Sequence, residues 1–181
     1  MKNRFNIHTI ALLIFSILIS SCKKEEEQIE GCTDNLAMNY FASANSNDGS
    51  CIYAYDIAQG VWNIIPDCDE YIIPVIGTVI SLNDQLPETI EVQGSGNNSL
   101  YILLNEVQVN GTIDNLGNVT VSTQTISLDM GFGPMDIDVE GSGVINSATD
   151  GIMNLTYSFE IETIPLFPIS ESLDCAISLY K

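Results

Sequence analysis

The sequence predicts an all-β protein, a single antiparallel barrel or barrel-like sandwich of about eight or nine strands. Two observations predict this class. Several windows within residues 56–181 alternate apolar and polar residues with a period of two, and none has a convincing helical stripe. Turn residues separate these windows at a spacing typical of antiparallel sheets. With 181 residues, 45% of them hydrophobic, the chain has room for one such domain and its attachments.

Residues 1–21 are predicted to be a signal peptide. Lys2 and Arg4 precede an uncharged run over residues 9–21, which as a helix would reach about 20 Å, short of a hydrocarbon core of about 30 Å. The end of this run, Ile19-Ser-Ser-Cys22, resembles the lipobox of bacterial lipoproteins. The resemblance implies cleavage before Cys22 and a lipid on its sulfur that attaches the protein to a membrane. The alternatives are a chance cysteine after an ordinary signal peptide, or an uncleaved anchor.

Residues 22–30 are expected to form an acidic tether. They begin with Cys22-Lys-Lys-Glu-Glu-Glu27, and lysine followed by acidic residues at this place resembles the surface-export signal of Bacteroidota lipoproteins. The resemblance implies a lipid-anchored protein at the outer membrane or cell surface. A charge run of this kind also suits a solvated tether.

Residues 31–53 are predicted to be a small module rich in turns, because Asn, Asp, Ser and Gly dominate them. The elements Gly31-Cys-Thr-Asp34, Ala37-Met-Asn-Tyr40 and Asp48-Gly-Ser-Cys51 resemble a short repeat of secreted proteins from marine Bacteroidota. Oxygen ligands of the kind that calcium prefers are also present. The calcium candidates are Asp34, Asn45, Asn47 and Asp48. The alternative is a loop of Asx turns held by a disulfide, and no other cofactor is expected.

The cysteine count predicts two disulfides. Four cysteines remain once Cys22 is assigned to the lipid, and export would place them in an oxidising compartment. We expect Cys32–Cys51, because this pair lies within the small module, and therefore Cys68–Cys175. A zinc site is the rival interpretation, but the chain has no CxxC motif and no histidine after His8.

The body, residues 56–181, is predicted to carry the barrel. In residues 151–163 one face holds Met153, Leu155, Tyr157, Phe159 and Ile161, and in the last strand Leu173, Cys175, Ile177 and Leu179 share a face. Further strands are expected near 59–65, 71–82, 88–93, 99–109, 111–114, 118–128 and 135–145. Turn signals occur at 83–84, 94–96, 110–111, 115–117 and 131–133, and Asn110-Gly111 is a strong hairpin signal.

Two resemblances concern this body. Gly60-Val-Trp62 at the start of the first strand resembles lipocalins and related calycin-like barrels. Trp62, Cys68, Gly141-Ser-Gly143, Leu155-Thr-Tyr157 and the Cys175–Lys181 strand resemble small lipocalin-like lipoproteins of Bacteroidota. They imply a barrel in which Trp62 is a candidate ligand-binding residue, although it also suits a core plug. The chain departs from lipocalins in having no C-terminal helix and no arginine to cap the barrel base.

Composition excludes several kinds of chemistry. Without residues 1–21 the chain keeps 3 lysines against 24 carboxylates, no arginine and no histidine, for a net charge of −21. This composition excludes Ser-His-Asp and Cys-His catalysis within one chain, imidazole metal sites and arginine clamps on phosphate. Nucleic acid would be repelled, since binding it requires neutralisation of its phosphates.

Carboxylate chemistry is what remains. Asp136, Asp138 and Glu140 share one strand face, and Asp67, Asp69 and Glu70 flank Cys68. A carboxylate pair can cleave a glycosidic bond, but a solvated outer face accounts for the same pattern. The apolar segment Ile164–Ile169 with its two prolines suits a lid over a barrel mouth or a packed loop.

The sequence therefore predicts a non-enzymatic, lipid-anchored binding or structural module. Its expected partners are the membrane, through the lipid, and either a small apolar ligand or a protein. The alternatives are a lipocalin-like carrier of a small apolar ligand and, more weakly supported, a carboxylate-based carbohydrate-active enzyme. A carrier would need an apolar cavity of about 300–1,000 Å³, whereas a structural barrel would be filled by side chains.

Overall fold

The computed structural model describes residues 27–73, 77–104, 106–129, 133–161 and 169–181. The predicted signal peptide, Cys22 and most of the Ile164–Ile169 segment lie outside these ranges. Among the described residues, no helix combines the length and apolar character that crossing a membrane requires.

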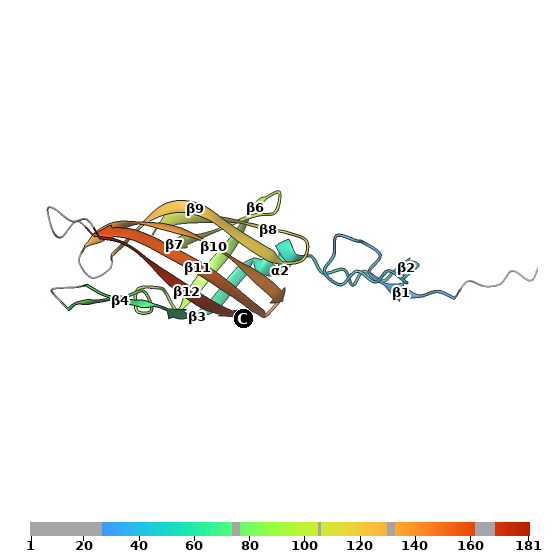
Figure 1. The fold of residues 1–181 in the computed structure, drawn as a ribbon. Coiled ribbons are helices and arrows are strands. Elements are labelled where there is room, and N and C mark those ends of the chain that lie inside the picture. The colour runs from blue at the N-terminus through green and yellow to red at the C-terminus, as the bar shows by residue number, and fades with distance from the viewer. Residues whose placement is uncertain (1–26, 74–76, 105, 130–132, 162–168) are drawn as a thin grey trace, which may run out of the picture.

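Eight strands form one closed antiparallel barrel (Figure 1), which confirms the predicted fold class. Each strand pairs with the barrel strand next to it in sequence, and the last pairs with the first to close the wall. The barrel strands are β3 (Gly60–Cys68), β6 (Thr89–Gly96), β7 (Ser99–Leu104), β8 (Val107–Ile113), β9 (Asn118–Asp129), β10 (Pro134–Ser147), β11 (Asp150–Ile161) and β12 (Ile169–Tyr180).

A short hairpin is inserted between the first two strands of the barrel. It consists of β4 (Glu70–Ile72) and β5 (Val79–Ser81), which form a separate two-stranded sheet. The expectation of a single strand over residues 71–82 was wrong. Gly77 has a φ of +66°, a left-handed conformation that glycine adopts readily and that turns the chain back on itself.

Two of the predicted turns were also placed wrongly. Asn110-Gly111 lies inside β8, where it pairs with Leu100 and Tyr101 of β7. This register buries apolar side chains on the inner faces of both strands, and that burial outweighs the local turn preference. Residues 94–96 produce an irregularity in the β6–β7 pairing, and the turn follows at Asn97-Asn98, both with positive φ.

The alternation predicted for the last two strands is confirmed. On β11 the inner residues Tyr157, Phe159 and Ile161 are buried, and on β12 so are Leu173, Cys175, Ile177 and Leu179. Trp62 of β3 and Ile137 of β10 are fully enclosed. The apolar core is therefore the interior of the barrel, extended by Ile80 and Leu82 of the inserted hairpin region.

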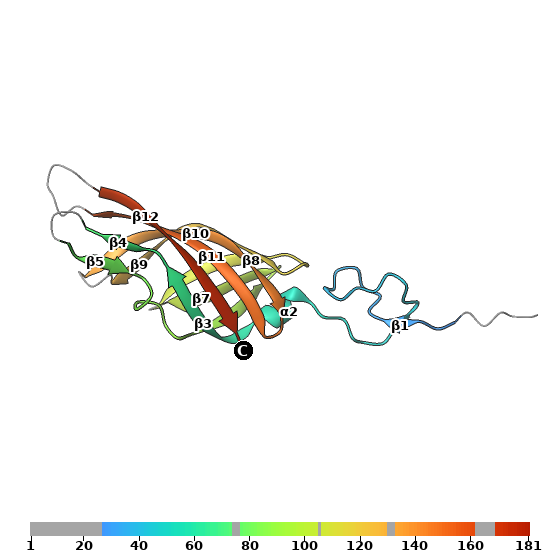
Figure 2. The ribbon, with the colours of Figure 1, turned by 60° about the horizontal axis from the view of Figure 1, so that its bottom comes forward.

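The two ends of the barrel differ (Figures 1 and 2). At one end the five-residue helix α2 (Ala54–Ala58) buries Ala54 and Ala58 against the core. The N-terminal module, with its short parallel strands β1 (Glu30–Gly31) and β2 (Ser46–Asn47), lies beyond this helix. The β4–β5 hairpin lies at the opposite end.

The barrel wall is tightly paired at the α2 end and opens along two seams toward the other end. The β8–β9 ladder has only two residue pairs, Thr112–Thr120 and Ile113–Val119, beside the turn that joins the strands. The β3–β6 ladder has four pairs, all within the first half of β3. We call these places the β8–β9 seam and the β3–β6 seam.

At each seam a side-chain amide pairs with a strand edge where the backbone pairing has stopped. At the β8–β9 seam, the Asn110 N–H donates to Gln124 Oε1 at 2.8 Å, and Gln124 Nε2 donates to the Asn110 carbonyl at 2.7 Å. At the free edge of β3, the Cys68 N–H donates to Asn83 Oδ1 at 2.9 Å, and Asn83 Nδ2 donates to the Cys68 carbonyl at 3.3 Å. Each amide thus pairs with both backbone groups of one residue, as a neighbouring strand would.

Candidate functional site

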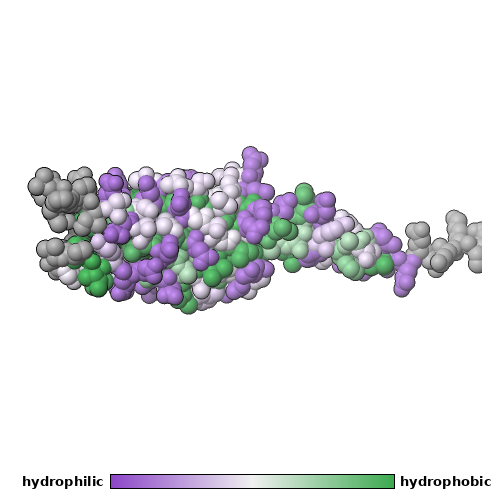
Figure 3. Space-filling model, in the orientation of Figure 1, coloured by the Kyte–Doolittle hydropathy of each residue, from purple (hydrophilic) through white to green (hydrophobic). Residues whose placement is uncertain are grey.

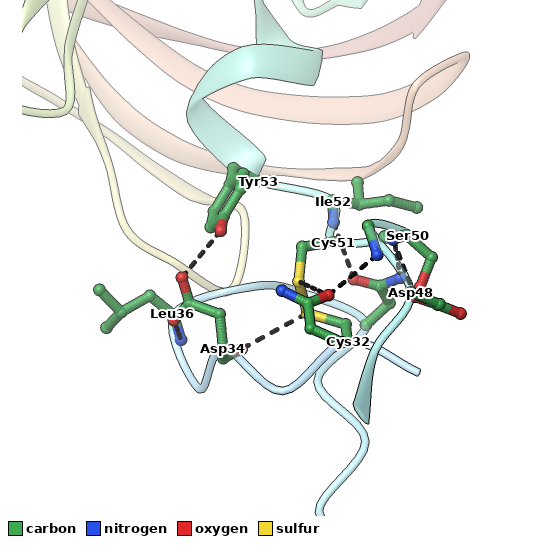
Figure 4. The surroundings of a disulfide bond; sticks show 11 residues. Cys32, Asp34, Leu36, Asp48, Ser50, Cys51, Ile52 and Tyr53 are labelled. Atoms are coloured by element: carbon green, nitrogen blue, oxygen red, sulfur yellow. Dashed lines mark hydrogen bonds between the residues drawn. A yellow bond between two sulfur atoms is a disulfide. The ribbon is translucent and has the colours of Figure 1, made fainter. Parts of the chain in front are cut away.

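The small module is built around the Cys32–Cys51 disulfide (Figure 4), one of the two bridges expected from the sequence. Cys32 is almost fully buried. Asn39 Oδ1 accepts from the Ile52 N–H at 2.8 Å, and Asn39 Nδ2 donates to the Ser50 carbonyl at 2.6 Å. The bridge and Asn39 together fix the second half of the module against the first.

The four calcium candidates are engaged in separate local hydrogen bonds. Asp34 accepts from the Leu36 N–H and the Tyr53 hydroxyl, and these bonds lower the pKa of its carboxyl. Asp48 accepts from the Ser50 N–H, Asn47 from the Gly49 N–H, and Asn45 from the Ile29 N–H. Asp34 and Asp48 lie on opposite sides of the disulfide (Figure 4). These oxygens support turns, and within the described ranges no three carboxylate, cysteine or histidine side chains are grouped to hold a metal ion.

The second expected bridge, Cys68–Cys175, lies within the barrel wall. The two cysteines are direct partners in the β3–β12 ladder, so the bond crosses between adjacent strands on the inner face. Both are buried. They are 107 residues apart in sequence, so one covalent bond ties the first barrel strand to the last.

The carboxylates on β10 lie on the outside of the barrel. Asp136, Asp138 and Glu140 are exposed, while Ile137 and Val139 between them are buried. Hydroxyl groups on the next strand, β9, pair with two of them: Thr125 donates to Asp138 at 2.6 Å, and Thr123 donates to Glu140. In the view of Figure 3, hydrophilic residues cover much of the barrel face, with small apolar areas among them.

The interior of the barrel contains an apolar cavity of about 120 Å³. Ala58 and Trp62 line it at the α2 end, and Ile126, Val139 and Tyr157 line it from the long strands. Leu86, in the segment between the β4–β5 hairpin and β6, also contributes. The lining includes Asn110, Gly111 and Val121, so the cavity reaches the β8–β9 seam.

Trp62, the candidate ligand-binding residue, forms part of this lining and is held firmly. Its indole N–H donates to the Ala58 carbonyl at 2.7 Å. Lys181 lies on the ring, with Nζ 4.2 Å from the ring centroid, within range of a cation–π interaction. The same ammonium donates to the carbonyls of Ile57 and Gln59 at 2.8 and 2.7 Å, and its partial burial lowers its pKa. Lysine therefore caps the barrel base, in a chain that has no arginine after Arg4.

The chain matches no family model, no curated protein and no solved structure. The candidate site therefore stands on its own geometry. It joins Trp62, the ligand-binding residue expected from the sequence, to three residues for which no binding role was expected: Leu86, Tyr157 and Lys181. The period-two pattern identified Tyr157 as inward-facing, but its place beside a cavity depends on side chains from the seven other barrel strands and the inserted segment.

Proposed function

We propose that this chain is a lipid-anchored, non-enzymatic binding module whose barrel takes up a small apolar molecule. The observation that carries the proposal is the cavity of about 120 Å³ inside the barrel, with an almost entirely apolar lining. The carboxylates that a carbohydrate-active enzyme would use on β10 face outward, away from it.

The volume limits the ligand. Pockets that hold drug-sized ligands measure about 300–1,000 Å³, so a lipid chain would not fit without repacking. An engineered apolar cavity of about 150 Å³ stays dry and binds benzene. The matching ligand here is a molecule with about one small ring. By the scale from cavity-creating substitutions, a void of this volume corresponds to about 3 kcal/mol of lost packing, which a ligand can recover.

Toluene tests the binding proposal. With the exported chain carrying Cys22→Ser, an excess of about 100 times the Kd should raise the melting temperature by about 5–10 °C. Val121→Leu, which extends a lining side chain into the cavity, should raise the melting temperature without ligand and abolish the response to toluene. Val107→Leu is the matched control, because Val107 packs against the core but does not line the cavity. If toluene does not raise the melting temperature of the chain without Val121→Leu, the binding proposal fails and the barrel is purely structural.

The lipid anchor is a separate part of the proposal and has its own test. It rests on the resemblance of Ile19–Cys22 to a lipobox. The native chain should fractionate with membranes and gain the mass of acyl chains, and Cys22→Ser should release it. Acyl-free, soluble behaviour of the native chain would contradict the anchor and leave the cavity proposal intact.

A further inference from the structure

Among the residues that the structure describes, the Tyr157 hydroxyl has no hydrogen-bond partner, and this concerns the cavity directly. Four lining side chains carry a nitrogen or oxygen: Trp62, Tyr101, Asn110 and Tyr157. The first three are paired: Trp62 with the Ala58 carbonyl, Tyr101 with Gln93 Oε1 at 2.5 Å, and Asn110 with Gln108 at 2.6 Å. No described residue forms a hydrogen bond with the Tyr157 hydroxyl. Buried tyrosine hydroxyls usually find a partner, so this one calls for an explanation.

The unpartnered hydroxyl belongs to a residue that lines the cavity. Tyr157 as a whole is 1% exposed. Every fully enclosed side-chain nitrogen or oxygen in the described ranges has a partner, so the Tyr157 oxygen is not fully enclosed. Tyr157 lies on the inner face of β11, between Val139 of β10 and Leu173 of β12, and lines the cavity. Because Tyr157 lines the cavity, we take the cavity to be the open space that its oxygen meets.

The surroundings favour a neutral binding partner. Burial raises the pKa of Tyr157 to about 12, so the hydroxyl keeps its proton at ordinary pH. Lys181 is the sole lysine, arginine or histidine from residue 27 onward, and it lies against Trp62 rather than in the cavity lining. A charged group placed in the cavity would lose its hydration without gaining a counter-charge. A water molecule is also a poor occupant, because it needs two or more polar partners and the lining offers one free side-chain group.

We propose that the cavity binds a neutral molecule of about one small ring whose single polar atom forms a hydrogen bond with the Tyr157 hydroxyl. This inference rests on the proposed binding function and adds the chemical class of the ligand. Phenol or a small cyclic ketone has the required combination of an apolar body and one polar atom. Fatty acids and other anions fall outside the class.

Phenol and toluene, which are similar in size and shape, test the hydrogen bond. Their dissociation constants would be measured by calorimetry on the exported Cys22→Ser chain and on the same chain with Tyr157→Phe. Tyr157→Phe removes one oxygen and keeps the ring, and it should raise the melting temperature because it removes an unpaired buried hydroxyl. It should also weaken phenol binding at least fivefold relative to toluene, which is the loss of about one hydrogen bond. Tyr101→Phe is the matched control, since that hydroxyl also belongs to a lining residue but is already paired with Gln93.

The outcomes separate this inference from the proposal beneath it. If toluene does not bind, the cavity is not a binding site and both proposals fail. If toluene binds but the phenol-to-toluene ratio is the same in Tyr157→Phe as in the parent, the cavity binds ligands without the hydroxyl and only this inference is overturned. This inference alone is also overturned if Tyr101→Phe changes the phenol-to-toluene ratio as much as Tyr157→Phe does.

Discussion

Lys181 makes three polar contacts at the base of the barrel. Its ammonium contacts the Trp62 ring and donates to the carbonyls of Ile57 and Gln59, which lie at the end of α2. The Ile57 carbonyl lies in the last turn of this helix and the Gln59 carbonyl directly after it, where a positive charge is favourable. A single residue thus joins β12, β3 and α2, and it holds in place a side chain that lines the cavity.

Replacing this lysine tests its role at the scale of one residue. Lys181→Met keeps most of the apolar stem but removes the charge and both hydrogen bonds. We expect it to lower the free energy of unfolding by about 1 kcal/mol, and hence the melting temperature by about 2–4 °C, since the site is largely exposed. Lys181→Arg keeps a cation over the ring and should retain most of the stability in the same thermal unfolding measurement. Equal melting temperatures for the Met variant and the parent would show that the contact contributes nothing.

At the scale of the element, the two seams explain how a closed barrel can have one firm end and one loosely paired end. The β9 strand has an irregularity opposite Val139–Gly141 of β10, and beyond this point it no longer pairs with β8. Gln124 comes directly after that irregularity and reaches across to Asn110. Because the cavity extends to this seam, we expect ligands to reach it here.

A substitution at Gln124 should loosen the seam. In Gln124→Ala the Asn110 N–H loses its acceptor, so its hydrogen exchange, followed by NMR, should accelerate at least tenfold. The stability loss should be about 1 kcal/mol. Gln108→Ala is the control, because Gln108 bonds the side chain of Asn110 and not its backbone. Equal protection of the Asn110 amide in both variants would contradict the bridging role of Gln124.

The elements also show what the sequence could and could not predict. Side-chain alternation placed Tyr157 and Cys175 on the inner face, because period two is a property of each strand by itself. The local turn preference of Asn110-Gly111 gave a wrong prediction, because the position of a turn also depends on which strand pairing buries more apolar surface. The cavity and the unpartnered hydroxyl could not be predicted, since both depend on how side chains from all eight barrel strands fit together.

At the scale of the whole molecule, the two disulfides act on different bodies. Cys32–Cys51 closes a loop of 19 residues within the small module, whereas Cys68–Cys175 spans 107 residues and encloses nearly the whole barrel. In the chain-entropy model, loop closures of these lengths stabilise by about 3 and about 4.7 kcal/mol respectively. The long bridge should therefore dominate the stability of the barrel.

Paired substitutions measure this difference. Cys68→Ala with Cys175→Ala should lower the melting temperature of the barrel by about 10 °C or more, given a loss of about 4 kcal/mol. Cys32→Ala with Cys51→Ala should leave the barrel transition nearly unchanged, because that bridge lies within the module. Thermal unfolding followed by the circular dichroism signal of the β-strands distinguishes the two double variants. Equal decreases in melting temperature for the two double variants would argue that the module and the barrel unfold together.

The side-chain amides that replace backbone pairing at the seams can change chemically as the protein ages. Asn83 and Gln124 can deamidate, as every asparagine and glutamine can, and the product is a carboxylate. An ionised carboxylate accepts hydrogen bonds but donates none. The carbonyls of Cys68 and Asn110 would then face a negative oxygen instead of an N–H group. Deamidation of either residue should therefore loosen the barrel at its seam, while the end closed by α2 stays intact.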